Sequence, residues 1–314
     1  MLKITALLMI ALLVGCAEPE EDRVRIGINP WPGYELLYLA DTLGLYKQAG
    51  LQVDIVQLSS LADTQRAFLQ ERLDGMASTL IEASVAASRS PQPLLLGLVT
   101  DYSNGADVII AGKGLASMQA LRGKIIGAEL QSLGVVLLAR ALAHHQMTFS
   151  DIQLRNVEQA QVPQALLENK VQAVVSYPPE SLKLLSDVRH KVIFSSREIP
   201  NEIIDVVVFR QSHVIDEAWL RKFRMVWQQA YEYWQEHPIE SVRLMAQREG
   251  LSEAEFKDAL QGLEILSDKQ QGALISERSH LLDNILSTCT VLRDVVSMSI
   301  DCERVKTHLQ IPGP

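Results

Sequence analysis

Two aromatic side chains in this sequence stand next to rigid prolines. Trp31 lies between Pro30 and Pro32, and Tyr177 is followed by two prolines. Each aromatic residue ends a short apolar run that is typical of a buried β-strand. Because proline restricts the backbone, such a loop holds a flat ring in place at low entropic cost, and the ring can attract a cation. We predict that Trp31 and Tyr177 contact a ligand; the alternative for Trp31 is packing beneath the following helix.

Acidic side chains gather in the same kind of position, near the ends of apolar strands, whereas these loop segments contain no lysine or arginine. Aromatic rings combined with carboxylates favour a cation, an amine-bearing zwitterion or a protonatable heterocycle, since a bare anion would normally find a basic partner. Arg197, farther along the chain, is the residue that could supply such a basic partner. The acidic candidates are Glu82, Asp101, Glu129, Glu180 and Asp205. Asp205 lies within a predicted strand, where the alternative is a structural role.

Other candidates have two possible roles. Ser60, Thr79 and Ser132 precede predicted helices, where they could cap the helix or bind a ligand, and the helix N-terminus at Ser132 also suits an anion or a carbonyl. Asn104 with Gly105 indicates a surface turn or a hinge. The complete set of predicted ligand-binding residues is Trp31, Tyr34, Ser60, Thr79, Glu82, Asp101, Tyr102, Asn104, Glu129, Gln131, Ser132, Tyr177, Glu180 and Asp205.

Several chemistries are not predicted. His144 and His145 are adjacent on a predicted helix, where neighbouring side chains diverge, so we expect no metal site. The Gly112-Lys113-Gly114 segment lacks the spacing of a phosphate-binding loop. No Gly-x-Ser-x-Gly motif occurs, and no catalytic residues or cofactor are predicted.

The N-terminal residues predict export. Met1 to Gly15 combines one charge, Lys3, with an apolar run too short to span a bilayer, which is typical of a signal peptide. The residues before Cys16 resemble the lipobox of bacterial lipoproteins. This resemblance implies cleavage before Cys16, acylation of Cys16 and a polar tether at residues 16–22; the alternative is an ordinary signal peptide. We expect a lipid-anchored protein on the periplasmic face of a bacterial membrane, or on the outer face of the cell membrane in a Gram-positive source.

Composition limits the partners and predicts one crosslink. Cleavage after Gly15 would remove 15 of the 314 residues and one of the 29 basic residues, taking the formal net charge from −9 to −10. A chain this acidic is not expected to bind nucleic acid. Besides Cys16, only Cys289 and Cys302 remain, and in an oxidising compartment they are expected to form a disulfide; two buried thiols are the alternative.

The elements that position these residues alternate between strands and helices. Apolar strands are predicted within residues 24–99 and again within 108–209, with intervening helices such as Tyr34 to Ala49. The chain after these strands is almost all helical, with segments at Asp216 to Glu236, Ile239 to Arg248, Glu253 to Gln261 and Gln270 to Leu286, and Ser252 is an expected N-cap. This alternation predicts an α/β protein with mostly parallel sheets flanked by helices and a helical C-terminal region. We expect two lobes: residues 23–104 with 205–314, and residues 105–204.

Four segments carry a resemblance to a known family. Val24 to Ser60, Leu121 to Leu142, Val171 to Glu180 and Glu198 to Arg210 resemble periplasmic substrate-binding proteins of ABC importers, in the nitrate/sulfonate/taurine group that includes thiamine-pyrimidine binders. The resemblance implies a two-lobed, type II-like periplasmic-binding-protein fold. It also implies a hinge, a small-molecule ligand and a membrane permease as partner. A monomer is expected.

Three functions remain open at this point. The first is a solute-binding lipoprotein of an importer, with a taurine-like zwitterion or an aminopyrimidine as ligand, because either would satisfy both the resemblance and the local chemistry. The second is a sensory protein that presents its ligand to a membrane receptor. The third is an enzyme related to thiamine-pyrimidine synthesis. The sequence disfavours this third function, since relatives of that kind use a cysteine-rich segment and no cysteine lies between Cys16 and Cys289.

Overall fold

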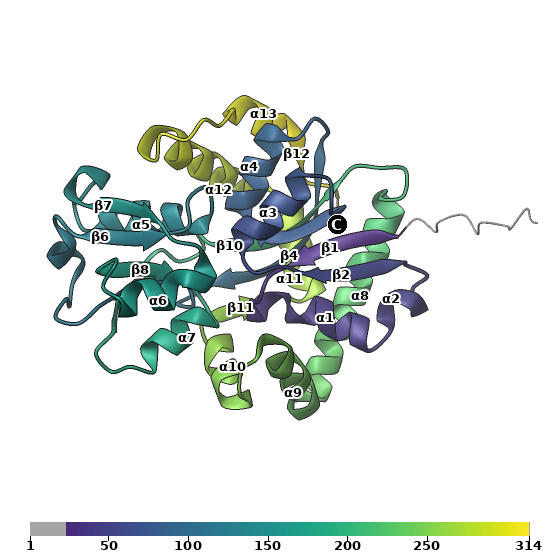
Figure 1. Cartoon of the computed structure of the whole chain (residues 1–314). Helices are drawn as coiled ribbons and strands as arrows, with labels where there is room; N and C mark the ends of the chain where they lie inside the picture. Colours follow the sequence, from purple (N-terminus) through teal and green to yellow (C-terminus); the bar gives the residue numbers. More distant parts are fainter. Residues whose placement is uncertain (1–22, 314) are drawn as a thin grey trace, which may run out of the picture.

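The computed structural model describes residues 23–313. The predicted signal peptide, the predicted acylation site Cys16 and the predicted tether at residues 16–22 lie outside the described residues. The chain folds around two β-sheets with helices on their faces (Figure 1). This arrangement confirms the predicted α/β fold class.

The larger sheet combines the first part of the chain with strands from its end. Its order is β11-β4-β10-β3-β1-β2, with β12 beside β4, and only β10 and β11 oppose the common strand direction. The strands are β1 (Val24–Ile28), β2 (Val53–Gln57), β3 (Gly75–Thr79), β4 (Leu94–Ser103), β10 (Ile204–Arg210), β11 (Leu263–Ile265) and β12 (Leu309–Gln310).

The smaller sheet is built from one continuous stretch of chain. Its order is β7-β6-β8-β5-β9, and β5 alone runs against the others. Its strands are β5 (Val108–Ala111), β6 (Ile125–Ala128), β7 (Gln153–Asn156), β8 (Ala173–Ser176) and β9 (Lys191–Ser195). Strands β3, β4, β5 and β8 are buried at every position. That burial explains why they are apolar over most of their length rather than alternating, with polar residues only near their carboxyl ends.

Helices cover both faces of each sheet. Those around the smaller sheet are α5 (Leu133–His144), α6 (Val162–Leu167) and α7 (Glu180–Leu185). Those around the larger sheet are α1 (Glu35–Thr42), α2 (Leu45–Gln48), α3 (Leu61–Leu69), α4 (Leu80–Arg89), α8 (Glu217–Glu236), α9 (Pro238–Glu249), α10 (Glu253–Leu260), α11 (Asp268–Glu277), α12 (Ser279–Thr290) and α13 (Cys302–His308).

Two predicted helices are each broken in the structure. The helix expected from Tyr34 to Ala49 is interrupted before α2 at Gly44, which has a φ of +68°. The helix expected from Gln270 to Leu286 is divided into α11 and α12 at Arg278, which has a φ of +48°. A left-handed residue cannot continue a right-handed helix, so both predictions were wrong at these points.

The chain crosses between the sheets twice, after β4 and again between β9 and β10. The two crossing segments lie side by side, because the Ser103 and Ser196 hydroxyl oxygens are 2.8 Å apart and the Gly105 N–H donates to Ser196 Oγ at 2.7 Å. Residues far apart in sequence therefore form a compact double connection between the sheets.

The C-terminal region is pinned to the larger sheet. Cys289 at the end of α12 and Cys302 at the start of α13 form a disulfide, the pairing expected from the sequence, with 5.8 Å between their Cα atoms. Beyond α13, β12 adds to β4 in parallel. No helix within residues 23–313 is both long and apolar enough to cross a membrane.

Candidate functional site

A small, largely buried cavity lies where the strand ends of both sheets converge. Its lining side chains are packed so closely that it has no room for a water molecule. In α/β folds of this kind, ligands bind beyond the carboxyl ends of the strands. The cavity is lined by Asn29, Trp31, Tyr34, Leu61, Asp107, Leu133, Tyr177 and Asp205.

The two aromatic residues next to prolines meet in this cavity. The rings of Trp31, after β1, and Tyr177, after β8, are in edge-to-face contact with centroids 5.9 Å apart. The Tyr177 hydroxyl also accepts a hydrogen bond from the Leu61 backbone N–H at the start of α3, at 3.3 Å. Both aromatic side chains are buried. Each sheet thus contributes one ring to the contact, and the two sheets are held close together.

Buried carboxylates line and surround the cavity, and several of their oxygens lack a partner. The Tyr34 hydroxyl donates to Asp205 Oδ1, and Trp31 Nε1 donates to Asp101 Oδ2 at 3.4 Å. Within the described residues, Asn29 Oδ1, Asp101 Oδ1 and Asp205 Oδ2 are buried without a hydrogen-bond partner. Since buried polar atoms are normally paired, these oxygens mark places for a hydrogen-bond donor.

Burial raises the pKa values of these acids. Desolvation raises the pKa of Asp101 and that of Asp107 to about 7. The pKa of Asp205 lies well above its ordinary value, first because of burial and then because of the negative charge of Asp101. Among the described residues that line the cavity there is no lysine or arginine. The site therefore stabilises protons or other positive charge.

Glu82 connects the two sheets at one side of the cavity. Its Oε2 accepts from the Thr79 N–H at 3.0 Å in a capping box at the start of α4. Its Oε1 accepts from the Ser132 hydroxyl at 2.6 Å and from the Leu133 N–H at 2.7 Å, at the start of α5. A carboxylate of the protein thus occupies the N-terminus of α5, the position at which the sequence suggested an anion or carbonyl.

Glu129 and Ser60 support the walls of the cavity from behind. Glu129, whose pKa is raised to about 7 by burial, accepts from the Gln159 N–H at 3.2 Å. Gln159 in turn donates to the Tyr177 carbonyl oxygen at 3.0 Å. Ser60 caps α3 by accepting from Asp63 N–H, which is the alternative role predicted for it.

Ten of the fourteen predicted residues do not line this cavity. Six of them lie behind or beside its walls: Ser60, Thr79, Glu82, Asp101, Glu129 and Ser132. The other four make contacts elsewhere. Tyr102 packs near the His280 ring, and the Asn104 carbonyl accepts from Arg197. The Gln131 side chain accepts from Arg89, and Glu180 forms an ion pair with Lys183. Arg197 therefore contacts the crossing segment and supplies no basic group to the cavity lining.

Four cavity residues were not in the predicted set: Asn29, Leu61, Asp107 and Leu133. Asn29 ends the first apolar run and Asp107 precedes the first strand of the second series, so a systematic choice of polar residues at strand ends would have included both. Leu61 and Leu133 are the first residues of α3 and α5. An apolar residue at a helix start gives no sequence signal for a ligand site.

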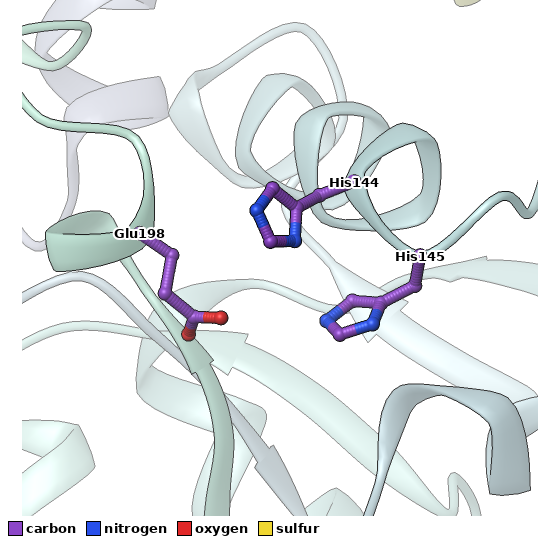
Figure 2. Close-up of side chains that lie close together, drawn as sticks. All are labelled: His144, His145 and Glu198. Carbon is purple, nitrogen blue, oxygen red and sulfur yellow. The ribbon is translucent and has the colours of Figure 1, made fainter.

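A second group of side chains lies outside the cavity. Figure 2 shows the carboxylate of Glu198 pointing toward the imidazole rings of His144 and His145. One potential ligand atom from each of the three residues lies within 4.8 Å of the other two. The adjacent histidines do not diverge here as expected, because His144 is the last residue of α5 and His145 is its C-cap, outside helical geometry.

Solved structures with a similar fold include sulfonate-binding proteins. The alkanesulfonate-binding protein SsuA of Xanthomonas axonopodis pv. citri, bound to MOPS, is 17% identical with a TM-score of 0.73, over 92% of this chain and 98% of that one. The periplasmic aliphatic sulphonate-binding protein SsuA of Escherichia coli is 15% identical with a TM-score of 0.74, over 93% of each chain.

A third such structure is the putative sulfonate-binding SsuA of Methylobacillus flagellatus KT, with 16% identity, a TM-score of 0.65 and 91% of each chain covered. At these identities the likeness establishes the fold. No match to a curated protein was found. The model of the NMT1/THI5-like family matches residues 31–241, more than half of the chain, and the protein therefore belongs to this family, as its resemblance to importer binding proteins indicated.

Proposed function

We propose that this protein is the extracytoplasmic solute-binding component of an ABC importer and that its ligand carries a protonated or proton-donating nitrogen. The observation that carries the proposal is the set of buried, unpaired oxygens at Asn29, Asp101 and Asp205. A nitrogen with several N–H groups would donate to these oxygens. It would also neutralise part of the negative charge that raises the pKa of Asp205.

The same geometry disfavours a simple anion. The N–H groups at a helix N-terminus are a common anion site, but at α5 the carboxylate of Glu82 already accepts from the Leu133 N–H. A sulfonate brought near Glu82 and Asp107 would meet like charge without a basic partner among the cavity-lining residues. A taurine-like ligand therefore fits through its ammonium group, and an aminopyrimidine fits through its ring nitrogens and amino group.

The aromatic pair supplies the rest of the recognition. A flat, positively charged or protonatable ring can contact Trp31 from one sheet and Tyr177 from the other. Because the cavity has no room for a water molecule, whereas typical ligand pockets hold roughly 300–1,000 Å³, entry of such a ligand requires the sheets to move apart. Only the closed arrangement then offers both rings, so ligand binding favours closure.

Delivery and anchoring complete the proposal. Acyl chains on Cys16 would hold the protein at the membrane beside its permease, and capture without chemical change would be its whole role. A sensory protein with the same fold would present the closed form to a receptor. Uptake of the ligand should be lost in cells that lack the protein if it serves an importer. Uptake should be retained if the protein serves a receptor.

The proposed ligand chemistry is tested with matched pairs of small molecules. Taurine differs from ethanesulfonate, and 4-aminopyrimidine from pyrimidine, by one nitrogen group. We expect calorimetry to show that the nitrogen-bearing member of at least one pair binds at least about tenfold more tightly, because a hydrogen bond to a charged group contributes roughly 1.5–3 kcal/mol.

Thermal denaturation gives an independent measure, since a ligand that binds the folded state raises its stability. Ethanesulfonate and nitrate should leave the melting temperature unchanged. If ethanesulfonate binds as tightly as taurine, and pyrimidine as tightly as 4-aminopyrimidine, the acidic cavity does not select a nitrogen group and the proposal fails.

A further inference from the structure

The end of α5 and the second crossing segment together present three potential metal ligands. His144 and His145 close α5, and Glu198 belongs to the short 3-10 turn after β9. The imidazole centroids are 5.2 Å apart, and one ligand atom from each of the three residues lies within 4.8 Å of the other two (Figure 2). This cluster lies outside the acidic cavity and takes no part in the proposed ligand binding.

The supporting contacts orient these side chains. The Phe194 ring makes edge-to-face contacts with both histidine rings, with centroids 5.8 Å and 6.0 Å away. The Ser195 N–H donates to Glu198 Oε1 at 2.9 Å, which fixes that carboxylate and leaves Oε2 for another partner. Metal sites in proteins commonly have such a surrounding layer that holds the ligands in position.

One nitrogen of the cluster lacks a partner. His145 Nδ1 lies 3.3 Å from the Gln119 side-chain amide, whereas His145 Nε2 is buried and has no hydrogen-bond partner within the described residues. With the Gln119 amide turned so that its oxygen accepts from Nδ1–H, Nε2 carries a lone pair directed away from Gln119. Because the two orientations of an amide have the same shape, this rotation costs no packing.

We propose that His144, His145 and Glu198 bind a divalent zinc ion. Two imidazole nitrogens and one carboxylate oxygen suit Zn²⁺, with water as the fourth ligand, whereas Mg²⁺ and Ca²⁺ prefer oxygen ligands alone. Tetrahedral zinc at about 2.0–2.1 Å from its ligands places them roughly 3.4 Å from one another. The three side chains therefore move together by about 1 Å on binding, which exposed His144 and the Glu198 side chain allow.

Zinc at this position would join the C-terminal end of α5 to the segment that crosses back to the larger sheet. The other end of α5 is bonded to Glu82 of α4, a helix that packs on that sheet. The ion would thus restrict the movement of α5 relative to the crossing segment, and its binding is expected to stabilise the folded chain.

The test uses ZnCl₂ and the protein purified without a polyhistidine tag. We expect calorimetry to give one zinc per chain and a melting temperature raised by about 5 °C or more at a hundredfold excess over Kd, with no effect of MgCl₂. Glu198→Gln, which can keep the hydrogen bond from Ser195, should weaken zinc binding at least about tenfold, and His144→Ala should do the same.

His308→Ala on α13 is the matched control, because His308 lies outside this cluster. Cobalt substitution adds a spectroscopic measure: a tetrahedral Co²⁺ spectrum in the wild type, lost in Glu198→Gln, supports the assignment. The proposal is overturned if the Glu198→Gln and His144→Ala variants, folded by circular dichroism, bind zinc as tightly as His308→Ala does.

Discussion

At the scale of single residues, Glu82 joins the starts of two helices that belong to different sheets. In a capping box, a side chain normally accepts from the free backbone N–H groups at the start of one helix. Glu82 uses Oε2 in this way for its own helix α4, and it uses Oε1 for the start of α5, which packs on the other sheet. Buried without a basic side chain among these bonded partners, the carboxylate is held by charge-assisted hydrogen bonds and by the dipole of α5. It therefore serves as a contact between the sheets and takes the N–H groups that an anion would otherwise bind.

Replacement of Glu82 is expected to change the selectivity of the protein. Glu82→Ala leaves the Leu133 N–H and the Ser132 hydroxyl unpaired, so the variant should lose stability by about 1–3 kcal/mol. A small anion can then take the vacated position. We expect ethanesulfonate or sulfate to raise the melting temperature of Glu82→Ala but not of the wild type, as measured by thermal denaturation.

Glu180→Ala is the matched control for this experiment, because Glu180 is paired with Lys183 and does not line the cavity. It should gain no response to either anion. An equal response of the wild type, Glu82→Ala and Glu180→Ala would mean that Glu82 does not block an anion site.

Strand geometry determines which residues of the site can be predicted from the sequence. Trp31, Tyr34, Tyr177 and Asp205 could be placed because polar and aromatic residues near strand ends meet in α/β folds. Asp101 and Tyr102 are neighbours in β4, whose side chains alternate between faces, and only Asp101 is directed toward the cavity. The sequence indicates the alternation but not which face the cavity occupies.

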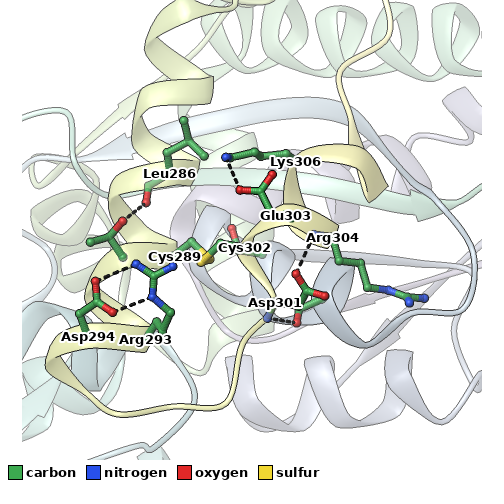
Figure 3. Close-up of a disulfide and its surroundings, with 12 residues drawn as sticks. Leu286, Cys289, Arg293, Asp294, Asp301, Cys302, Glu303, Arg304 and Lys306 are labelled. Carbon is green, nitrogen blue, oxygen red and sulfur yellow. Dashed lines mark hydrogen bonds and ion pairs between the residues drawn. A yellow bond between two sulfur atoms is a disulfide. The ribbon is translucent and has the colours of Figure 1, made fainter.

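At the scale of elements, the disulfide holds the last part of the chain in place. Figure 3 shows Cys289 and Cys302 joining the end of α12 to the start of α13. Beyond α13, β12 pairs with the beginning of β4, while β11 pairs with its end. The disulfide thus fixes a segment that covers one edge of the larger sheet, which otherwise would present unpaired backbone groups.

Removal of this disulfide is expected to destabilise the protein modestly. The bridged residues are 13 positions apart, so the closed loop is short and the double variant Cys289→Ser/Cys302→Ser should lose roughly 2–3 kcal/mol in urea denaturation. Hydrogen exchange should show faster exchange in α13 and β12 than in β1. Unchanged stability together with unchanged exchange would show that packing alone holds the C-terminal segment.

The elements that the sequence did not predict are the short or exposed ones. Strand β7 is exposed at every position, and β11 and β12 have three and two residues. Such strands carry no apolar pattern and depend on pairing with β6 or β4, which is a tertiary effect. The long apolar strands and the helices with N-caps such as Ser252 were predicted because their signals are local.

At the scale of the whole molecule, the buried acids make stability depend on pH in an unusual direction. Asp101 and Asp107 have folded-state pKa values of about 7, above their ordinary value of 3.8. Between about pH 4 and pH 7 the folded chain therefore binds more protons than the unfolded chain. The resulting stability is greatest at the acid end of this range and is lost as the pH rises toward 7.

We expect the unliganded protein to melt at a higher temperature at pH 5 than at pH 8. Each of these carboxyls changes the free energy of unfolding by at most about 1.4 kcal/mol per pH unit. The affinity for a cationic ligand should change in the opposite direction, falling as the acids become protonated. The double variant Asp101→Asn/Asp107→Asn should show a weaker dependence on pH for both the melting temperature and the ligand affinity. A wild-type melting temperature that falls steadily from pH 8 to pH 5 would show that these acids do not take up protons on folding.

The position of β10 has a consequence for the order in which the protein acquires its structure. In the larger sheet β3 and β4 are joined only through β10, which follows the whole smaller sheet in the chain. The smaller sheet needs residues 108–195 alone, so its contacts can form as soon as that stretch is available. The larger sheet must wait for residues 204–210 and must close a loop of about a hundred residues, which is slow. A chain that is still being synthesised therefore leaves one side of β3 and one side of β4 unpaired until residues 204–210 have been added, so the predicted export signal would meet a chain that has not finished folding.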